Sequence, residues 1–353
     1  MKTEILEIAK ELIALNTSEW NTIEQWKALE IIDMQLQEYS KKRFISKWVV
    51  SYIYFNSTKI PDEFDLILNC HIDIIPWNQD QFTCVEKQGK IYGAWALDMK
   101  WNLTSALLAF KNHAKMSKKN IAIQFVTDEE IWWYNGTKYQ LSMGIKSLFT
   151  ITTEPTNFGI VYKAKGVYQF ELTAKWTTYH SAYPWSGENA IENMLVFLNT
   201  FTKQFKNPDI DSWVTTYNVS EIYSPSQWYN KIPDICKVKI DLRFIPEDQE
   251  HIKQLIQELL TKNISICDYA FEPCFETDKN HKYIRMLQKW VEKYTWTWWK
   301  LYWANWTSDG RHFLKNAIEF WPIWSGIWSD KEWVDVQSLE DYYLILSDFI
   351  KNI

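Results

Sequence analysis

Residues 64–73 read Phe64-Asp-Leu-Ile-Leu-Asn-Cys70-His-Ile-Asp73, an apolar run that ends on an imidazole and a carboxylate. Continuous runs of this kind are typical of strands buried on both faces. Two further runs have the same form: residues 121–127 lead into Asp128-Glu129-Glu130, and residues 147–153 lead into Glu154. Helical periodicity separates the first two runs at about 102–115. The pattern therefore predicts an α/β fold with a mixed, largely parallel sheet flanked by helices.

The pattern of apolar residues changes near residue 163. Residues 167–174 and 238–244 alternate apolar with polar side chains, and helical spacing follows each at about 188–205 and 247–261. This pattern indicates a small α+β module at 164–276. We therefore predict a main domain formed by 1–163 and 277–353. Further helices are expected there at about 3–15, 23–41, 281–294 and 339–351.

Composition limits the class of protein. The chain has 353 residues and a net charge of −6 with no basic block, which argues against a nucleic-acid partner. Its longest apolar runs fall far short of the roughly 20 residues that span a bilayer. Five cysteines form no CxxC pair, and an odd number is typical of a reducing compartment. We expect a soluble cytoplasmic protein with no membrane partner.

Tryptophan and glycine are present in unusual numbers. The chain holds 22 Trp and 9 Gly, whereas about 25 Gly are expected at the usual ~7%. Many Trp stand where a turn calls for Gly, as at Trp101, Trp132 and Trp133. We hypothesise that a UGA codon read as Gly in the source organism is written here as Trp. The alternative is a Trp-rich binding surface, which has no need of Trp at turns.

The polar groups that end the three apolar runs point to a metal site. Carboxyl ends of parallel strands share one edge of a sheet, so His71, Glu129 and Glu154 are expected to converge there. Asp98, just before a predicted helix, can join them. Each acid alone is explained better by a helix cap or a solvated loop charge. Together, an imidazole and several carboxylates predict divalent cations of the zinc type.

The sequence resembles the M20 metallopeptidases and amidohydrolases, a family that includes succinyl-diaminopimelate desuccinylases and acetylornithine deacetylases. The resemblance runs from His71 to about Glu332. It rests on motifs in the family's order: His71-Ile-Asp73, Gly93-Ala-Trp-Ala-Leu-Asp98-Met-Lys-Trp101, Asp128-Glu129-Glu130, Glu154-Pro155, Tyr179-His180-Ser-Ala-Tyr-Pro184, Asn230-Lys-Ile-Pro-Asp234, Asp241-Leu-Arg243 and Thr307-Ser-Asp-Gly-Arg311. Reading Trp as Gly improves the match.

The resemblance implies roles for the residues at the strand ends. His71 and Glu154 would ligate one metal, Asp98 would bridge two, and Glu130 would ligate the second. Asp73 would orient His71, and Glu129 would be the general base. The metals would be two divalent ions, Zn²⁺ or Co²⁺. The peptide bond between Asp98 and Met99 would be cis.

The resemblance also gives the inserted module a role, as a ferredoxin-like lid and dimerisation domain in a homodimer. His180 would stabilise the oxyanion of the neighbouring subunit. Asn230, Arg243 and Arg311 would contact the substrate, although Arg243 also fits a solvent-facing strand position and Arg311 a turn-stabilising one.

One departure from the family concerns the last metal ligand, a His four residues before a Glu that corresponds to Glu332. Position 328 is Trp, or Gly under the codon hypothesis, and neither binds metal, so the second metal site is expected either to be weak or to use a shifted ligand. The leading prediction is a metal-dependent hydrolase that cleaves the amide bond of an N-acyl amino acid. Alternatives are a dipeptidase or carboxypeptidase of the same family, and a catalytically impaired binding protein.

Overall fold

The computed structural model describes residues 1–75, 82, 84–92, 99–131, 134–154, 156–296, 300–326 and 332–353. They form two compact units. Unit 1 comprises residues 1–163, 276–302 and 308–353, and unit 2 comprises residues 164–275 and 303–307. Among the described residues, no helix is both long enough and apolar enough to span a bilayer.

Unit 1 is built on a mixed sheet whose centre is parallel. The strands run in the order β1-β2-β6-β3-β7-β15-β8-β13, with β14 paired to β8. Strands β6, β3, β7 and β15 are parallel to one another, whereas β1 and β2 run antiparallel to their neighbours and β8 runs antiparallel to β15. The bounds are β1 Ser40–Ser46, β2 Val49–Phe55, β3 Leu66–His71, β6 Ile121–Val126, β7 Thr150–Thr152, β8 Ile160–Ala164, β13 Phe275–Glu276, β14 Leu301–Ala304 and β15 Ala317–Phe320.

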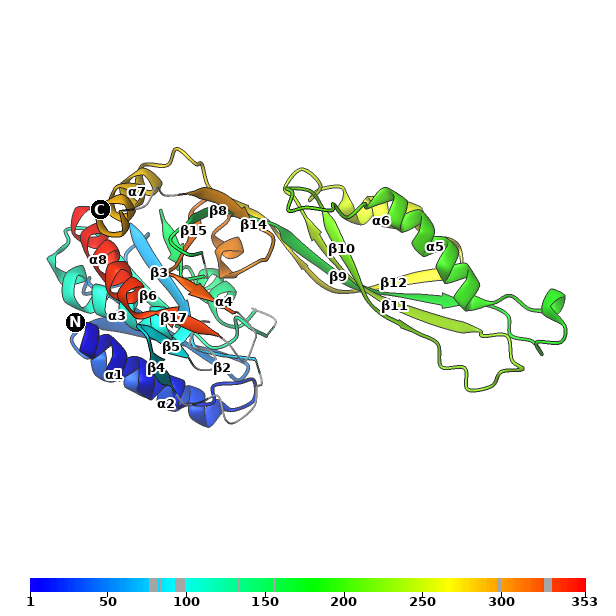
Figure 1. Cartoon of the computed structure of the whole chain (residues 1–353), viewed down its shortest axis with the longest axis horizontal. Helices are drawn as coiled ribbons and strands as arrows, with labels where there is room; N and C mark the ends of the chain where they lie inside the picture. The colour runs from blue at the N-terminus through cyan, green and yellow to red at the C-terminus, as the bar shows by residue number, and fades with distance from the viewer. Residues whose placement is uncertain are drawn as a thin grey trace. The chain divides into compact units, whose positions relative to one another are not determined.

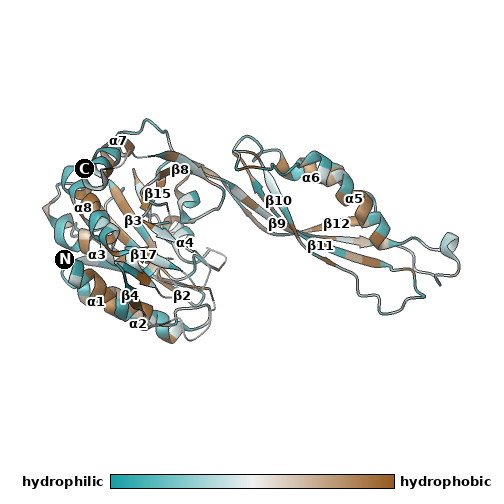
Figure 2. Cartoon of the chain, in the orientation of Figure 1, coloured by the Kyte–Doolittle hydropathy of each residue, from teal (hydrophilic) through white to brown (hydrophobic). Residues whose placement is uncertain are grey.

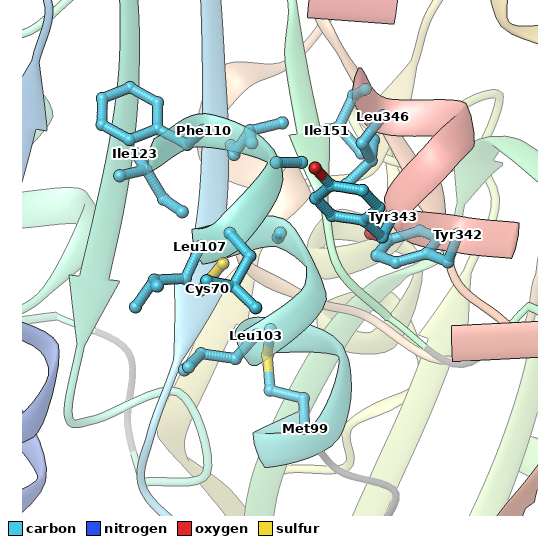
Figure 3. Packing of buried hydrophobic residues seen from close by; sticks show 14 of the residues in the cluster. Cys70, Met99, Leu103, Leu107, Phe110, Ile123, Ile151, Tyr342, Tyr343 and Leu346 are labelled. Carbon is cyan, nitrogen blue, oxygen red and sulfur yellow. The ribbon is translucent and has the colours of Figure 1, made fainter. Parts of the chain in front are cut away.

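Every residue of β3 and β6 is buried, so both faces of these central strands are covered. Helix α3 contacts α1, α8 and the strands β3 and β6 (Figure 1). Figure 3 shows side chains of α3 and α8 packed beside Cys70 of β3. The helices of unit 1 are α1 Lys2–Ile13, α2 Thr22–Gln35, α3 Trp101–His113, α4 Thr137–Ser142, α7 Lys282–Thr295 and α8 Val336–Asn352, with 3₁₀ turns η3 Ala114–Met116 and η5 Asp309–Phe313.

A second, small sheet of unit 1 has the order β16-β17-β5-β4. Its strands are β4 Val85–Lys87, β5 Lys90–Tyr92, β16 Trp324–Ser325 and β17 Trp333–Asp335. Asp335 then caps α8 by accepting a hydrogen bond from Ser338 N–H at 2.8 Å.

Unit 2 has the ferredoxin-like order of elements, β9-α5-β10-β11-α6-β12, with a sheet ordered β10-β11-β9-β12. Its own core lies between the sheet and the two helices, whose apolar stripes are visible in Figure 2. The bounds are β9 Gly166–Lys175, η4 Pro184–Ser186, α5 Ala190–Gln204, β10 Thr216–Tyr223, β11 Ile235–Phe244, α6 Ile252–Leu259 and β12 Ile264–Glu272. The predicted fold class is thus confirmed: a largely parallel sheet with helices, and a separate α+β unit.

Several strands of the structure were not predicted from the sequence, among them β1, β10 and β12. The predicted helix 23–41 ends at Gln35, and Ser40–Ser46 forms the edge strand β1. Only Phe44 of that strand is buried, so its sequence carries little apolar signal. Strands β10 and β12 were not predicted, because most of their side chains are exposed or half-buried and the alternation is weak.

Candidate metal centre

His71 is the last residue of β3 and is 2% exposed. Its Nδ1 lies 3.1 Å from the carbonyl oxygen of Asp73 and 3.6 Å from the carboxylate Oδ1 of the same residue. These contacts favour the tautomer with the proton on Nδ1, which leaves Nε2 as the ligand atom. The predicted orienting role of Asp73 therefore has matching geometry.

The segment after β6 brings two more carboxylates to His71. Glu130 N–H donates to Asp73 Oδ2 at 2.8 Å, which connects this segment to the end of β3. Ligand atoms of His71, Glu129 and Glu130 all lie within 4.8 Å of one another. His71 and Glu129 are buried and Glu130 is partly buried. Because β3 and β6 are parallel neighbours, their carboxyl ends deliver these groups to one edge, as predicted.

Negative charge is concentrated around Glu129. Burial raises the pKa of Glu129 well above its usual range; His71 and Arg311 lower it, and Asp309 and Asp73 raise it. Asp309 is itself buried, which raises its pKa, and Arg311 opposes this. Its Oδ1 lies 3.7 Å from His312 Nε2 and 4.0 Å from Arg311 Nη1.

Asp128 supports the turn that follows β6. Its Oδ2 accepts hydrogen bonds from the N–H groups of Asn135 and Gly136 at 2.8 and 3.0 Å. A Cβ at Gly136 would lie 2.1 Å from Asp128 Oδ1, so only glycine fits there. Burial, followed by the charges of Asp309 and Asp73, raises the pKa of Asp128 to about 8.

The remaining predicted ligands are placed less closely. Glu154 is buried two residues beyond the end of β7, but it is not part of the His71–Glu129–Glu130 group among the residues that the structure describes. Asp98 and position 328 lie outside the described residues, as does the predicted cis bond at Asp98. Glu332 is buried.

Three predicted residues lie in unit 2. His180 Nε2 and Asn230 Nδ2 are 3.5 Å apart, and both side chains are exposed. Arg243 donates to both carboxylate oxygens of Asp241, at 2.6 and 3.0 Å. Arg311, in contrast, is fully buried in η5 of unit 1.

The donor set fits a divalent cation. One imidazole and two carboxylates within a few ångströms match the ligands of zinc-like ions. Buried carboxylates without compensating positive charge are costly, and their raised pKa values express that cost. A cation bound close to Glu129, with His71 and Glu130 among its ligands, would reduce the cost.

Sequence reasoning missed two polar residues near this centre. Asp309 accepts a hydrogen bond from Thr137 Oγ1 at 2.5 Å, and Thr137 Oγ1 accepts one from Asn69 Nδ2 at 2.9 Å. Asp309 is part of the Thr307–Arg311 motif, but a role was predicted only for Arg311. Thr137 gave no signal, since a Thr at a helix start is ordinarily only a capping residue.

Comparisons with known proteins agree with this architecture. Residues 162–265 match the family model of the M20 peptidase dimerisation domain. The chain is 29% identical over 320 residues to a succinyl-diaminopimelate desuccinylase of Nautilia profundicola, covering 84% of this chain and 82% of the relative.

Solved structures share the fold. A tripeptidase from Staphylococcus aureus has a TM-score of 0.83 at 16% identity, covering 99% of this chain and 98% of that one. An M20 family metallo-carboxypeptidase from Sulfolobus solfataricus has a TM-score of 0.79 at 16% identity, with the same coverage. The resemblance to M20 proteins is confirmed.

Proposed function

We propose that the chain is a metal-dependent hydrolase that cleaves the amide bond of an N-acyl amino acid. The proposal starts from its match to the M20 peptidase dimerisation domain and from its M20 peptidase fold. The observation that supports this most is the buried group of His71, Glu129 and Glu130. Amide hydrolysis requires an activated water and stabilisation of the developing oxyanion. A divalent cation held beside Glu129 by the proposed ligands would supply a Lewis acid for the scissile carbonyl.

Glu129 is the proposed general base. It takes a proton from the attacking water and passes it to the leaving amine. Burial raises the pKa of Glu129, which makes its carboxylate a stronger proton acceptor than a solvated one. The positive charge of Arg311 lowers the pKa of Glu129 and so helps to keep the carboxylate available.

The proposed ligand set is His71, Asp98, Glu130 and Glu154, with Asp98 shared between two sites. We propose Zn²⁺ or Co²⁺ as the ions, since mixed imidazole and carboxylate donors suit both. The second site is expected to bind weakly, because position 328 supplies no ligand in this sequence.

Unit 2 is proposed to bind the substrate and a second copy of the chain. The exposed pair of His180 and Asn230 is available to a partner subunit's reaction centre, where His180 would stabilise the oxyanion. Arg243 would bind a substrate carboxylate, and Arg311 contributes a buried positive charge beside Glu129. Five free cysteines among the described residues support the proposal of a reducing, cytoplasmic location.

The acyl group favoured is succinyl or acetyl, because the desuccinylase relative covers most of both chains. Peptide cleavage is the second candidate, favoured by the two peptidases that share the fold.

A substrate panel separates these possibilities. Zinc- and cobalt-loaded protein is incubated with N-succinyl-diaminopimelate, N-acetylornithine, and a set of di- and tripeptides, and released amine is quantified. Turnover of an acylated amino acid alone supports the proposal, and turnover of peptides alone supports the second candidate. A metal-loaded protein that cleaves none of them would indicate an impaired binding protein.

A further inference from the structure

Met99 is a buried thioether at the point where the predicted ligand segments meet. It is 1% exposed and lies two residues before α3 (Figure 3). In sequence it directly follows Asp98. The proposed reaction does not use the side chain of Met99.

The sulfur of Met99 accepts a hydrogen bond from the backbone of His71, at 3.2 Å from N to Sδ. In a strand, the N–H groups of residues i and i+2 point to the same side. The carbonyl of Asn69 accepts a bond from Thr153 N–H, so Asn69 and His71 both face β7. Strand β7 ends at Thr152, and the thioether replaces the ladder acceptor that a longer strand would offer.

The same sulfur contacts the end of β7. Thr153 Oγ1 lies 3.3 Å from Met99 Sδ and also 3.3 Å from the carbonyl oxygen of Asn69, so two acceptors share its proton. Thr153 immediately precedes Glu154. On the other side, Lys100 Nζ donates to the carbonyl of Leu15 at 2.7 Å and holds the start of α3 in place.

We propose that Met99 is a positioning residue whose thioether sets the relative positions of the segments carrying His71 and Glu154. This inference rests on the proposed metal centre. Leucine would fill a similar volume but offers no acceptor, so the His71 N–H would be buried without its partner. The end of β3 would then shift or fluctuate, and the imidazole with it.

The test compares the zinc dissociation constants of Met99→Leu, Met99→Gln and Leu103→Met with that of the wild type, by chelator competition. Outer-shell groups typically alter metal affinity about 10- to 100-fold, and we expect about 10-fold weaker binding for Met99→Leu. Met99→Gln keeps the length of the side chain and restores an oxygen acceptor, so it should recover most of the affinity. Leu103→Met changes a neighbouring core side chain on α3 and should bind zinc as the wild type does.

Wild-type affinity in Met99→Leu would overturn the inference. If the wild type itself binds no zinc, the proposed function fails, and amide hydrogen exchange at His71 then decides the role of Met99. Faster exchange in Met99→Leu than in Met99→Gln would support the hydrogen bond, and equal exchange in all variants would overturn it.

Discussion

The polar groups around His71 in unit 1 and the His180–Asn230 pair of unit 2 differ in their exposure to solvent. Around His71, the carboxylates of Asp73, Asp128, Glu129 and Asp309 are all at most 8% exposed. In unit 2, His180 and Asn230 are exposed, and Arg243 is already paired with Asp241. Burial of several like charges is costly unless a cation is added, whereas exposed groups cost little until a ligand arrives. The first region therefore suits the proposed metal, and the second suits the proposed substrate or partner.

The largest effect is expected from Glu129→Gln in unit 1. The amide cannot accept the proton, so kcat should fall by about 10²- to 10⁴-fold. Bound zinc should remain close to stoichiometric, because Glu129 is proposed as base and not as ligand. Steady-state kinetics and metal analysis on the same preparation check both parts. A variant with near-normal kcat would remove Glu129 from the chemistry.

A smaller effect is expected from His180→Ala in unit 2. Loss of one oxyanion donor typically costs about 10²- to 10³-fold in kcat, and bound zinc should not change. The matched control is His251→Ala, another exposed histidine of unit 2 that has no proposed role. Equal loss of activity in both variants, or loss of zinc from His180→Ala, would contradict the assignment of oxyanion stabilisation to unit 2 and of metal binding to unit 1.

A third prediction concerns His281, a partly buried histidine of unit 1 that is not a proposed metal ligand. Its Nδ1 accepts the Tyr283 N–H at 3.3 Å and caps α7. Burial lowers the pKa of His281, helped by Lys282 and opposed by Asp278. Between its folded value and the unfolded value of about 6.5, the unfolded chain binds more protons, so stability is lost as pH falls through this window.

His281→Asn keeps an N-cap acceptor that does not titrate. From pH 7.5 to 5.5 the wild type should lose about 0.5 kcal/mol more unfolding free energy than the variant, a value reduced for the ring's partial exposure. Urea unfolding at both pH values measures this. An identical pH dependence for the two proteins would contradict the assignment.

The smallest effect concerns Trp296, which ends α7 with φ 55° and is 92% exposed. A left-handed backbone favours glycine, so Trp296→Gly should stabilise the protein by about 1 kcal/mol. Trp185→Gly is the control, since Trp185 is also exposed but has no positive φ. Urea unfolding of both variants measures the difference, and a gain in neither would show that Trp296 carries no backbone strain.

Trp20, with φ 71°, occupies a similar turn. These two positions support the hypothesis that some Trp stand for Gly in the native protein, which an intact mass measurement of that protein would decide. The prediction of a turn at Trp101 is wrong, because Trp101 is the buried first residue of α3 and has no positive φ, and positions 132 and 133 lie outside the described residues.

The sequence predicted the centre of unit 1 well because buried parallel strands carry a continuous apolar signal. The groups at their ends, His71, Glu129 and Glu130, could be placed together from strand direction alone. Edge strands such as β10 could not be predicted, because pairing and not composition makes them strands. Met99 was missed because its role depends on where β7 ends, which no local pattern records. Thr137 was missed because its partners, Asn69 and Asp309, are distant in the sequence.

Zinc content of the wild type and of His71→Ala, after loading and exhaustive dialysis, tests the central claim most directly. The account predicts stoichiometric zinc in the wild type and loss of most of it in the variant, with both proteins folded by circular dichroism. A wild-type protein that retains no zinc, or a variant that retains as much as the wild type, would contradict it.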